Sequence, residues 1–267
     1  MKKIFITGSG GFLGGYLTKR LVKEGYEVHG LYTGKEVAKQ KKTPRKVIMH
    51  QSDLMEYKEM GQIVKSINPD FIIHLAARTE VEKSFYDPIE FSEINYCGTV
   101  NLIEAAKECD NLKLFLFAST METYGWTPVS RTIEEGRENY SREPFTENTL
   151  QSPNAPYAVA KVACEKYLEY AARAYGFPYC TLRQTNAYGR WDNDFFVVEQ
   201  IITQMLKNPK EVNLGYGKPH RNFLFVDDLI NLYVRILEMN EEAKFNTFCT
   251  GPANALSIEK LAGMIAD

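Results

Sequence analysis

The sequence predicts a doubly wound α/β fold, in which helices cover both faces of a parallel sheet. Short apolar runs alternate with segments whose apolar residues recur every three or four positions, the spacing of a buried helix face. The first apolar run also leads directly into a glycine-rich turn. Parallel strands are buried on both faces and need long connections, so this alternation favours a parallel sheet with right-handed helical crossovers.

Six apolar runs fit buried strands, at residues 3–7, 27–32, 46–50, 71–76, 112–119 and 179–183. Helical repeats fill three of the connections: Leu13, Leu17 and Leu21; Ile63 and Ile67; Val100, Ile103 and Ala106. The alternation weakens after residue 185, where we expect helices at 195–206, at 228–239 and from Ser257. The sequence therefore predicts one sheet domain over residues 1–184 and a smaller lobe over residues 185–267.

Composition excludes several classes of protein. A formal net charge of −2 argues against nucleic acid as a partner. Five scattered cysteines without a CxxC pair indicate neither a disulfide framework nor a zinc site, and they fit a reducing cytoplasm. The four histidines have no metal-binding spacing. No run approaches the ~18 apolar residues of a membrane span, and the N-terminal run is too short for a signal peptide.

The glycine-rich turn after the first strand has the spacing GxxGxxG, with Gly8, Gly11 and Gly14 around the start of a helix that opens with Phe12 and Leu13. Glycine is needed there because the turn is tight and a pyrophosphate must approach backbone N–H groups at the positive end of the helix. The turn therefore predicts a dinucleotide-binding site.

The second and third strands indicate how the cofactor's adenosine end is bound. NAD sites commonly place an acidic residue after the second strand, but this chain has Tyr32 and Thr33 there, with Lys35 just beyond. This favours NADP over NAD, although Lys35 also fits a solvated loop charge. Asp53 and Leu54 follow the third strand, where Asp53 is placed to meet the adenine or to cap a helix.

A tyrosine and a lysine, Tyr157 and Lys161, lie four residues apart on a predicted helix and so share one face. An ammonium beside a phenol can lower the pKa of the phenol from about 10 and make it a proton acceptor. The preceding strand ends at Ser119 and Thr120, at the carboxyl edge where open α/β sheets bind ligands. The position predicts an oxidoreductase centre.

With these motifs the chain resembles an extended short-chain dehydrogenase/reductase of the nucleotide-sugar epimerase/dehydratase family. The resemblance covers the whole chain and includes HLAA at 74–77, NYCGT at 95–99, RQTNAYG at 183–189 and RNFLFVDD at 221–228. It implies a Rossmann fold, a tightly bound NAD(P) and a nucleotide-diphosphate sugar as substrate. It also implies a homodimer formed through the helices near Ile89 and Tyr157.

The resemblance further implies roles for individual residues. The cofactor would be lined by Ala76, Ala77, Asn95, Ser119, Tyr157 and Lys161, and the substrate by Ser84, Thr120, Met121, Asn186 and Arg221. Tyr157 would take the proton of the sugar C4 hydroxyl while Thr120 holds its oxygen and Lys161 binds the nicotinamide ribose. Simpler interpretations remain open for three residues, with Asn95 as a helix cap, His74 as a satisfied core histidine and Arg221 as a surface charge.

The fate of the C4 ketone depends on the residues after Thr120. The family's 4,6-dehydratases carry acidic residues or Ser-Glu there, and this chain has Met121 and Glu122. Glu122 is a candidate base for the C5 proton, which favours dehydratase chemistry, but Met121 cannot donate a proton to the departing hydroxide. The alternatives are a 4-epimerase, a UDP-glucuronate decarboxylase, a ketosugar reductase, Glu122 as a solvent-facing loop residue and, without enzymatic activity, a cofactor-sensing protein.

Two segments depart from the family pattern. Residues 126–156 lack clear periodicity and are longer than the usual connection, so we expect a loop over the substrate or against a partner. The chain also ends earlier than related chains, which fits a short member or a truncated one.

Overall fold

The computed structural model describes residues 1–33, 44, 46–125, 130–134, 137–141, 144–190 and 195–266, with the backbone alone at 130–134 and 137–141. Its centre is a seven-stranded sheet in the order β12-β8-β5-β4-β1-β2-β3. Every pairing is parallel, which confirms the predicted fold class. The strands are β1 (Lys3–Thr7), β2 (Glu27–Tyr32), β3 (Ile48–Gln51), β4 (Phe71–His74), β5 (Leu114–Thr120), β8 (Tyr179–Gln184) and β12 (Asn246–Thr250).

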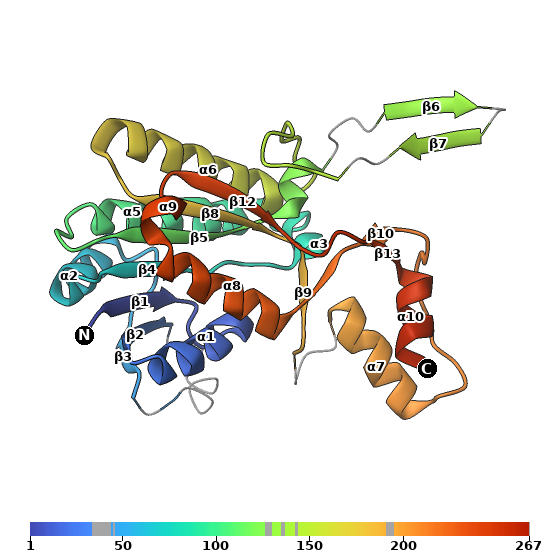
Figure 1. Cartoon of the computed structure of the whole chain (residues 1–267), viewed down its shortest axis with the longest axis horizontal. Coiled ribbons are helices and arrows are strands. Elements are labelled where there is room, and N and C mark those ends of the chain that lie inside the picture. The colour runs from blue at the N-terminus through green and yellow to red at the C-terminus, as the bar shows by residue number, and fades with distance from the viewer. Residues whose placement is uncertain are drawn as a thin grey trace.

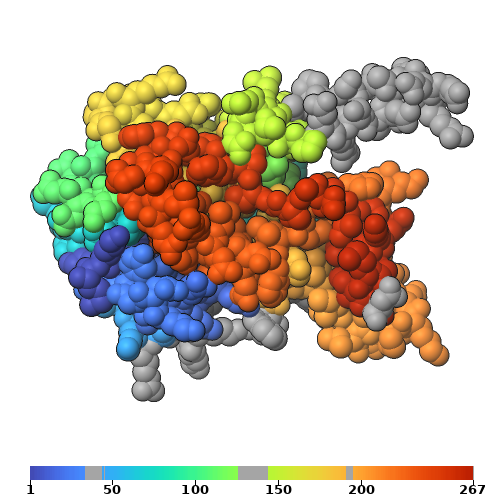
Figure 2. All heavy atoms as spheres, viewed as in Figure 1, coloured from blue at the N-terminus to red at the C-terminus, as the bar shows by residue number. Residues whose placement is uncertain are grey.

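Helices cover both faces of this sheet (Figure 1). Alternate residues of β1 point to opposite sides, so that Ile4 and Ile6 join one core and Phe5 joins the other. The first core is closed by α1 (Phe12–Lys23) and α8 (Val226–Glu238), which lie side by side in the space-filling view (Figure 2). The second core is closed by α2 (Tyr57–Ile67), α5 (Gly98–Ala106) and α6 (Pro156–Tyr175).

The strand order places the ligand-binding edge. The chain builds outward from β1 through β2 to β3, then returns to the other side of β1 with β4 and continues to β5. Ligands of open α/β sheets bind at such a switch point, outside the carboxyl ends of the strands. The glycine-rich turn after β1, the segment after β4 and the end of β5 therefore meet at one edge.

Short elements connect these layers: α3 (Val81–Ser84), α4 (Pro88–Ser92), the π-helix η2 (Glu93–Cys97), the 3-10 helix η3 (Met121–Tyr124) and α9 (Asn240–Ala243). The segment 126–156 is more regular than the sequence indicates. Its described part contains an antiparallel hairpin, β6 (Ser130–Glu134) and β7 (Arg137–Ser141), that extends from the body of the molecule (Figure 1).

A smaller group of elements, which we call the α7–α10 unit, has its own apolar cluster around Val198, Ile201 and Leu261. It contains α7 (Val197–Lys207), α10 (Ile258–Ala266) and the paired strands β10 (His220–Arg221) and β13 (Leu256–Ser257), and it lies to one side of the sheet (Figure 1). A second strand pair, β9 (Asn186–Tyr188) and β11 (Phe223–Phe225), links it to the sheet.

The boundary predicted at residue 184 does not coincide with these layers. α8 and β12 follow that boundary, but α8 packs on α1, and β12 extends the main sheet because it pairs with β8. We keep a two-part division as a proposal, with α8 and β12 assigned to the larger part. Within the described residues, no helix combines the length and the apolar character needed to cross a membrane.

Candidate active site

The turn after β1 requires glycine for a steric reason. Gly8 has φ +69°, and a Cβ on it would lie 2.8 Å from the backbone nitrogen of Ala76. A Cβ on Gly14 would lie 2.1 Å from the carbonyl oxygen of Gly8. Gly11 is the N-cap of α1, and no side chain among the described residues caps that helix end. A tight cradle at the positive end of a helix fits a dinucleotide pyrophosphate.

The floor of this edge is a buried hydrogen-bonded chain from β1 through β4 to α5. His74 Nδ1 lies 2.6 Å from Thr7 Oγ1, and its Nε2 lies 2.8 Å from Thr99 Oγ1. Burial, aided by the charge of Lys161, lowers the pKa of His74 to about 3. His74 is therefore neutral and structural, in agreement with the simpler interpretation of its motif.

Asn95 fixes the segment after β4 and is not a helix cap. Its Oδ1 accepts a hydrogen bond from the Arg78 backbone nitrogen at 2.8 Å, and its Nδ2 donates to the Arg78 carbonyl oxygen at 2.9 Å. Asn95 is buried in the π-helix η2, a type of helix that is frequent at functional sites. It holds the chain next to Ala76 and Ala77 at the edge of the glycine-rich turn.

The structure brings Tyr157, Thr120 and Glu122 together. Tyr157 is almost fully buried near the start of α6, and this burial raises the pKa of its phenol. A side-chain hydrogen bond with Thr120 lowers that pKa, and the nearby charge of Glu122 raises it. Thr120 Oγ1 also accepts from the Glu122 backbone nitrogen at 3.2 Å, which caps η3 and fixes the start of the segment that carries Glu122.

The contacts of Lys161 are with β5 and not with Tyr157. Its Nζ donates to the Ala118 carbonyl oxygen of β5 at 2.7 Å and lies 4.7 Å from the centre of the Phe117 ring. Burial lowers the pKa of Lys161 to about 8. Because the amine is directed at the strand, burial and not Lys161 dominates the pKa of Tyr157, which is raised rather than lowered.

A buried charge network that sequence reasoning missed supports this centre. Arg183 on β8 donates to Glu165 on α6 at 2.8 Å and to the Tyr124 hydroxyl at 2.5 Å. It also donates to the Glu147 carbonyl oxygen at 3.1 Å, and Ser119 donates to Glu165. The network joins β5, η3, α6 and the segment before α6. The sequence signals for it are indirect: Arg183 opens the RQTNAYG motif, and Glu165 lies four residues after Lys161.

Two residues predicted to bind ligands, Ser84 and Ser119, have hydroxyl groups that are hydrogen-bonded within the protein. Ser84 is fully buried, and its hydroxyl donates to the Val81 carbonyl oxygen in its own helix at 2.6 Å, so its side chain is not exposed to a substrate. The Ser119 hydroxyl donates to Glu165 and not toward the cofactor edge. Met121 opens η3 half-buried, next to Thr120.

The adenosine end has fewer fixed contacts. Tyr32 is the last residue of β2 and Thr33 follows it, and both side chains are half-buried. Lys35 lies outside the described residues. Asp53 is exposed, and its carboxylate accepts a bond from the backbone nitrogen two residues later at 3.0 Å, so it closes a turn ahead of α2 rather than capping the helix. Leu54 is buried in the second core, so its side chain is not exposed to a ligand.

The two residues expected at the nucleoside diphosphate lie on the small strand pairs. Asn186 begins β9 with its side chain exposed. Arg221 in β10 is also exposed and donates to the carbonyl oxygen of the preceding residue at 2.9 Å. Both side chains are accessible, and within the described residues no contact joins them.

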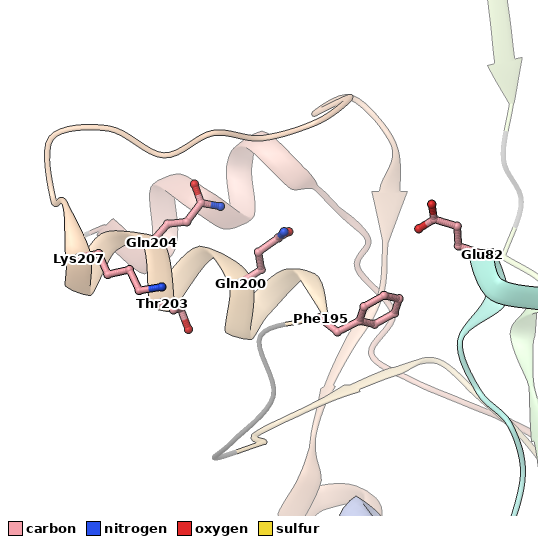
Figure 3. A pocket seen from close by; sticks show the side chains of 6 residues that line it. All are labelled: Glu82, Phe195, Gln200, Thr203, Gln204 and Lys207. Atoms are coloured by element: carbon pink, nitrogen blue, oxygen red, sulfur yellow. The ribbon is translucent and has the colours of Figure 1, made fainter.

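A cavity of about 610 Å³ lies between α3 and α7 (Figure 3). Glu82 and Phe195 lie at one end, and the polar face of α7 lines the rest with Gln200, Thr203, Gln204 and Lys207. None of the predicted catalytic residues lines this cavity. We place the chemistry at the sheet edge, because Tyr157, Thr120 and the glycine cradle lie there.

Comparison with known proteins assigns the family. The model of the NAD dependent epimerase/dehydratase family matches residues 4–249. A dTDP-D-glucose 4,6-dehydratase from Dictyostelium discoideum is 28% identical over 250 residues, covering 90% of this chain and 56% of that protein. A GDP-6-deoxy-D-mannose reductase from Pseudomonas aeruginosa is 27% identical over 273 residues, covering 100% of this chain and 80% of that protein.

Among solved structures, a UDP-glucose 4-epimerase from Thermotoga maritima with UDP-glucose has a TM-score of 0.86 and 26% identity, covering 98% of this chain and 81% of that one. The chain belongs to the NAD dependent epimerase/dehydratase family, among the extended short-chain dehydrogenase/reductases. This confirms the resemblance seen in its motifs. The chain spans little more than half of the length of the Dictyostelium relative.

Proposed function

We propose that this protein is an enzyme that oxidises a hydroxyl of a nucleotide-activated hexose transiently and then acts on the resulting ketone. The observation that carries the proposal is the cluster of Tyr157, Thr120 and Glu122 at the carboxyl edge of β5, one strand away from the β4 edge that flanks the glycine cradle. Relatives named as dehydratases, reductases and epimerases of nucleotide sugars support the substrate class.

Each residue of the site has a separate role in this proposal. The nicotinamide cofactor supplies a reversible hydride acceptor, and the Gly8 to Gly14 turn is its pyrophosphate site. Tyr157 accepts the proton of the sugar C4 hydroxyl, and Thr120 holds both the phenol and that oxygen by hydrogen bonds. Lys161 orients the ribose and keeps positive charge near the phenol when the site is filled.

Glu122 decides between the outcomes that we propose for the ketone. A C4 ketone acidifies the C5 proton, and Glu122 is close enough to Tyr157 for its charge to raise the phenol pKa. We therefore favour removal of the C5 proton by Glu122, loss of the C6 hydroxyl as water, and return of the hydride to C6 of the sugar, so that the oxidation is transient. Met121 supplies no acid for that departure, so a water has to serve. The second candidate is a 4-epimerase, favoured by the similarity to the Thermotoga maritima enzyme.

Two finer features also belong to the proposal. We keep NADP as the preferred cofactor, because neither Tyr32 nor Thr33 is the acid that commonly reads the ribose 2′-hydroxyl. We also propose a homodimer through α4 and α6. Ile89 on α4 is 71% exposed and Val159 on α6 is 53% exposed. Phe85, at the end of α3 just before α4, is 58% exposed, and a second copy would cover this surface.

The test is turnover of a panel of UDP-, GDP-, dTDP- and CDP-hexoses with NAD and with NADP, followed by mass spectrometry of the sugar nucleotide. A product lighter by one water supports the dehydratase if its rate of formation falls by about 10²- to 10⁴-fold in Glu122→Gln and in Tyr157→Phe. Glu238→Gln, on the exposed side of α8, is the matched control and should react like the wild type.

Other outcomes assign other activities. An unchanged mass with a new stereoisomer identifies an epimerase. With a 4-keto sugar nucleotide and NADPH in place of the hexose and the oxidised cofactor, stoichiometric consumption of NADPH identifies a reductase. With a nucleotide-linked uronic acid in place of the hexose, loss of carbon dioxide identifies a decarboxylase. Cofactor binding without turnover of any sugar nucleotide contradicts the catalytic assignment and favours a cofactor-sensing protein.

A further inference from the structure

One guanidinium connects the helix that carries the glycine-rich turn to the α7–α10 unit. Arg190 Cζ lies 4.1 Å from the centre of the Phe12 ring and 3.7 Å from the centre of the Phe196 ring. Phe12 is the first residue of α1, directly after the glycine-rich turn, and Phe196 is the N-cap of α7. The planar cation thus contacts both the start of α1, next to the glycine-rich turn, and the start of α7 in the α7–α10 unit.

The turn that carries this arginine is fixed on both sides. Glu199 on α7 is 7% exposed, and its Oε1 accepts hydrogen bonds from the backbone nitrogens of Gly189 and Arg190, both at 3.0 Å. Arg190 Nη1 lies 3.7 Å from the same carboxylate oxygen and donates to the Ala187 carbonyl oxygen at 2.6 Å. On the opposite side, the Tyr16 hydroxyl of α1 donates to the Gly189 carbonyl oxygen at 3.1 Å.

Simple packing does not require a charge at this position. Withdrawing a guanidinium from water costs free energy, and an apolar side chain would fill the space between two phenyl rings at lower cost. A guanidinium that stacks on two rings has a restricted geometry, because its planar group binds aromatic faces directionally. The arginine therefore fixes the distance and angle between Phe12 and Phe196 more tightly than a flexible apolar side chain would.

The same turn leads to both proposed ligand sites. It follows β9, which begins at Asn186, a residue that we propose to contact the nucleoside diphosphate. At its other end, Arg190 contacts Phe12, whose backbone forms the first turn of α1 at the pyrophosphate site. A ligand that stabilises the chain at either site therefore stabilises the same arginine contact.

We propose that Arg190 is a positioning residue that couples the two sites, so that a nucleoside diphosphate in the substrate site strengthens cofactor binding and the reverse. Coupling of this kind is reciprocal, and it arises when two ligands each stabilise the same contact. The inference rests on the proposed function, because it assumes both ligands.

The experiment measures the dissociation constant of NAD and of NADP by calorimetry, alone and with saturating UDP, dTDP or GDP. In the wild type we expect the effective nucleotide to tighten cofactor binding by about tenfold, within the usual range for coupled sites. Arg190→Met should bring this factor to about one, and Arg190→Lys, which keeps the charge without the plane, should leave an intermediate factor.

Arg20→Met is the matched control. Arg20 lies on α1, the helix that begins with Phe12, and donates to Asn231 on α8 at 2.7 Å, so its contact stays within the larger part of the molecule. This variant should keep the full coupling factor. A thermal unfolding temperature measured for each variant separates a structural role from the proposed one, since a structural role lowers that temperature without changing the ratio of dissociation constants.

Three results overturn the inference. Cofactor binding that is independent of every nucleotide in the wild type removes the coupling, and a full coupling factor in Arg190→Met assigns it elsewhere. If Arg190→Met does not fold, a full coupling factor in Arg190→Lys has the same meaning. Failure of the wild type to bind either cofactor is a different result, because it refutes the proposed function and the inference falls with it.

Discussion

Burial of the Lys161 amine lowers the free energy of unfolding at neutral pH, and urea unfolding can measure this effect. The amine is buried against β5, where burial lowers its pKa from 10.5 to about 8. In the unfolded chain the amine keeps its ordinary pKa, so between about pH 8 and pH 10.5 the unfolded state holds a proton that the folded state has lost. The free energy of unfolding therefore rises with pH across this window and is constant, at its lower value, below it.

The magnitude follows from the size of the displacement. One pKa unit corresponds to about 1.4 kcal/mol, so between pH 7 and pH 9.5 the wild type gains about 2 kcal/mol from this group. A Lys161→Met variant fills a similar volume but has no proton to lose, and it gains nothing from Lys161 over the same interval. The hydrogen bond to Ala118 that the variant also lacks changes its stability by a constant amount, which cancels in the comparison.

The assay is urea unfolding of both proteins, without ligands, at several pH values from 7 to 9.5. The difference in unfolding free energy between wild type and variant should move by about 2 kcal/mol in favour of the wild type as pH rises. Lys166→Met is the control, because that amine is 60% exposed in a surface ion pair. A difference that stays flat across this range refutes the reasoning and shows that the Lys161 amine is solvated in solution.

Three further changes test the site and its support. Gly14→Ala places a methyl group against the backbone, so it should lower the unfolding free energy by about 3 kcal/mol and abolish cofactor binding. Gly15→Ala is the control, because the space around its Cβ is open, and it should raise stability slightly. Urea unfolding measures the stability of each variant, and calorimetry measures its cofactor binding. Glu165→Gln leaves a buried guanidinium unpaired and should cost about 3 to 5 kcal/mol in urea unfolding, against less than about 1 kcal/mol for the surface variant Glu169→Gln. Ile89→Asp should convert the proposed dimer to a monomer in light scattering without loss of stability, and a wild type that is already monomeric contradicts the dimer.

The elements that local pattern could predict are those whose cause is local. The strand from Lys3 to Thr7 and the turn through Gly8 and Gly14 follow from a short apolar run and from backbone crowding within a few residues. β12 was missed because Asn246–Thr250 mixes polar and apolar residues, and only its pairing with β8 makes it a strand of the main sheet. Its place depends on a partner more than sixty residues away, which periodicity does not report.

The same limit applies within the candidate site. Tyr157 and Thr120 were predictable because their motifs place them on elements that meet at one edge. The hydrogen-bond partner of Lys161 was not predictable. Helical spacing puts its amine on the same helix face as Tyr157, but it does not show the carbonyl oxygen of β5 that accepts its hydrogen bond. Arg183 and Arg190 each owe their position to contacts with distant parts of the chain. Arg183 opens the RQTNAYG motif and Arg190 follows it, but the motif does not show those contacts.

The buried groups of the site share one property that bears on catalysis. Burial raises the pKa of Tyr157 and lowers the pKa values of Lys161 and His74, so each group is displaced toward its neutral form. A site that disfavours charge holds a poor proton acceptor when it contains no ligand, because forming the phenolate there costs more than in water. Opposite charges brought in by bound ligands would offset that cost, which links the reactivity of Tyr157 to a filled site. Coupling between the two ligand sites through Arg190 would then also limit the time during which only one of them is filled.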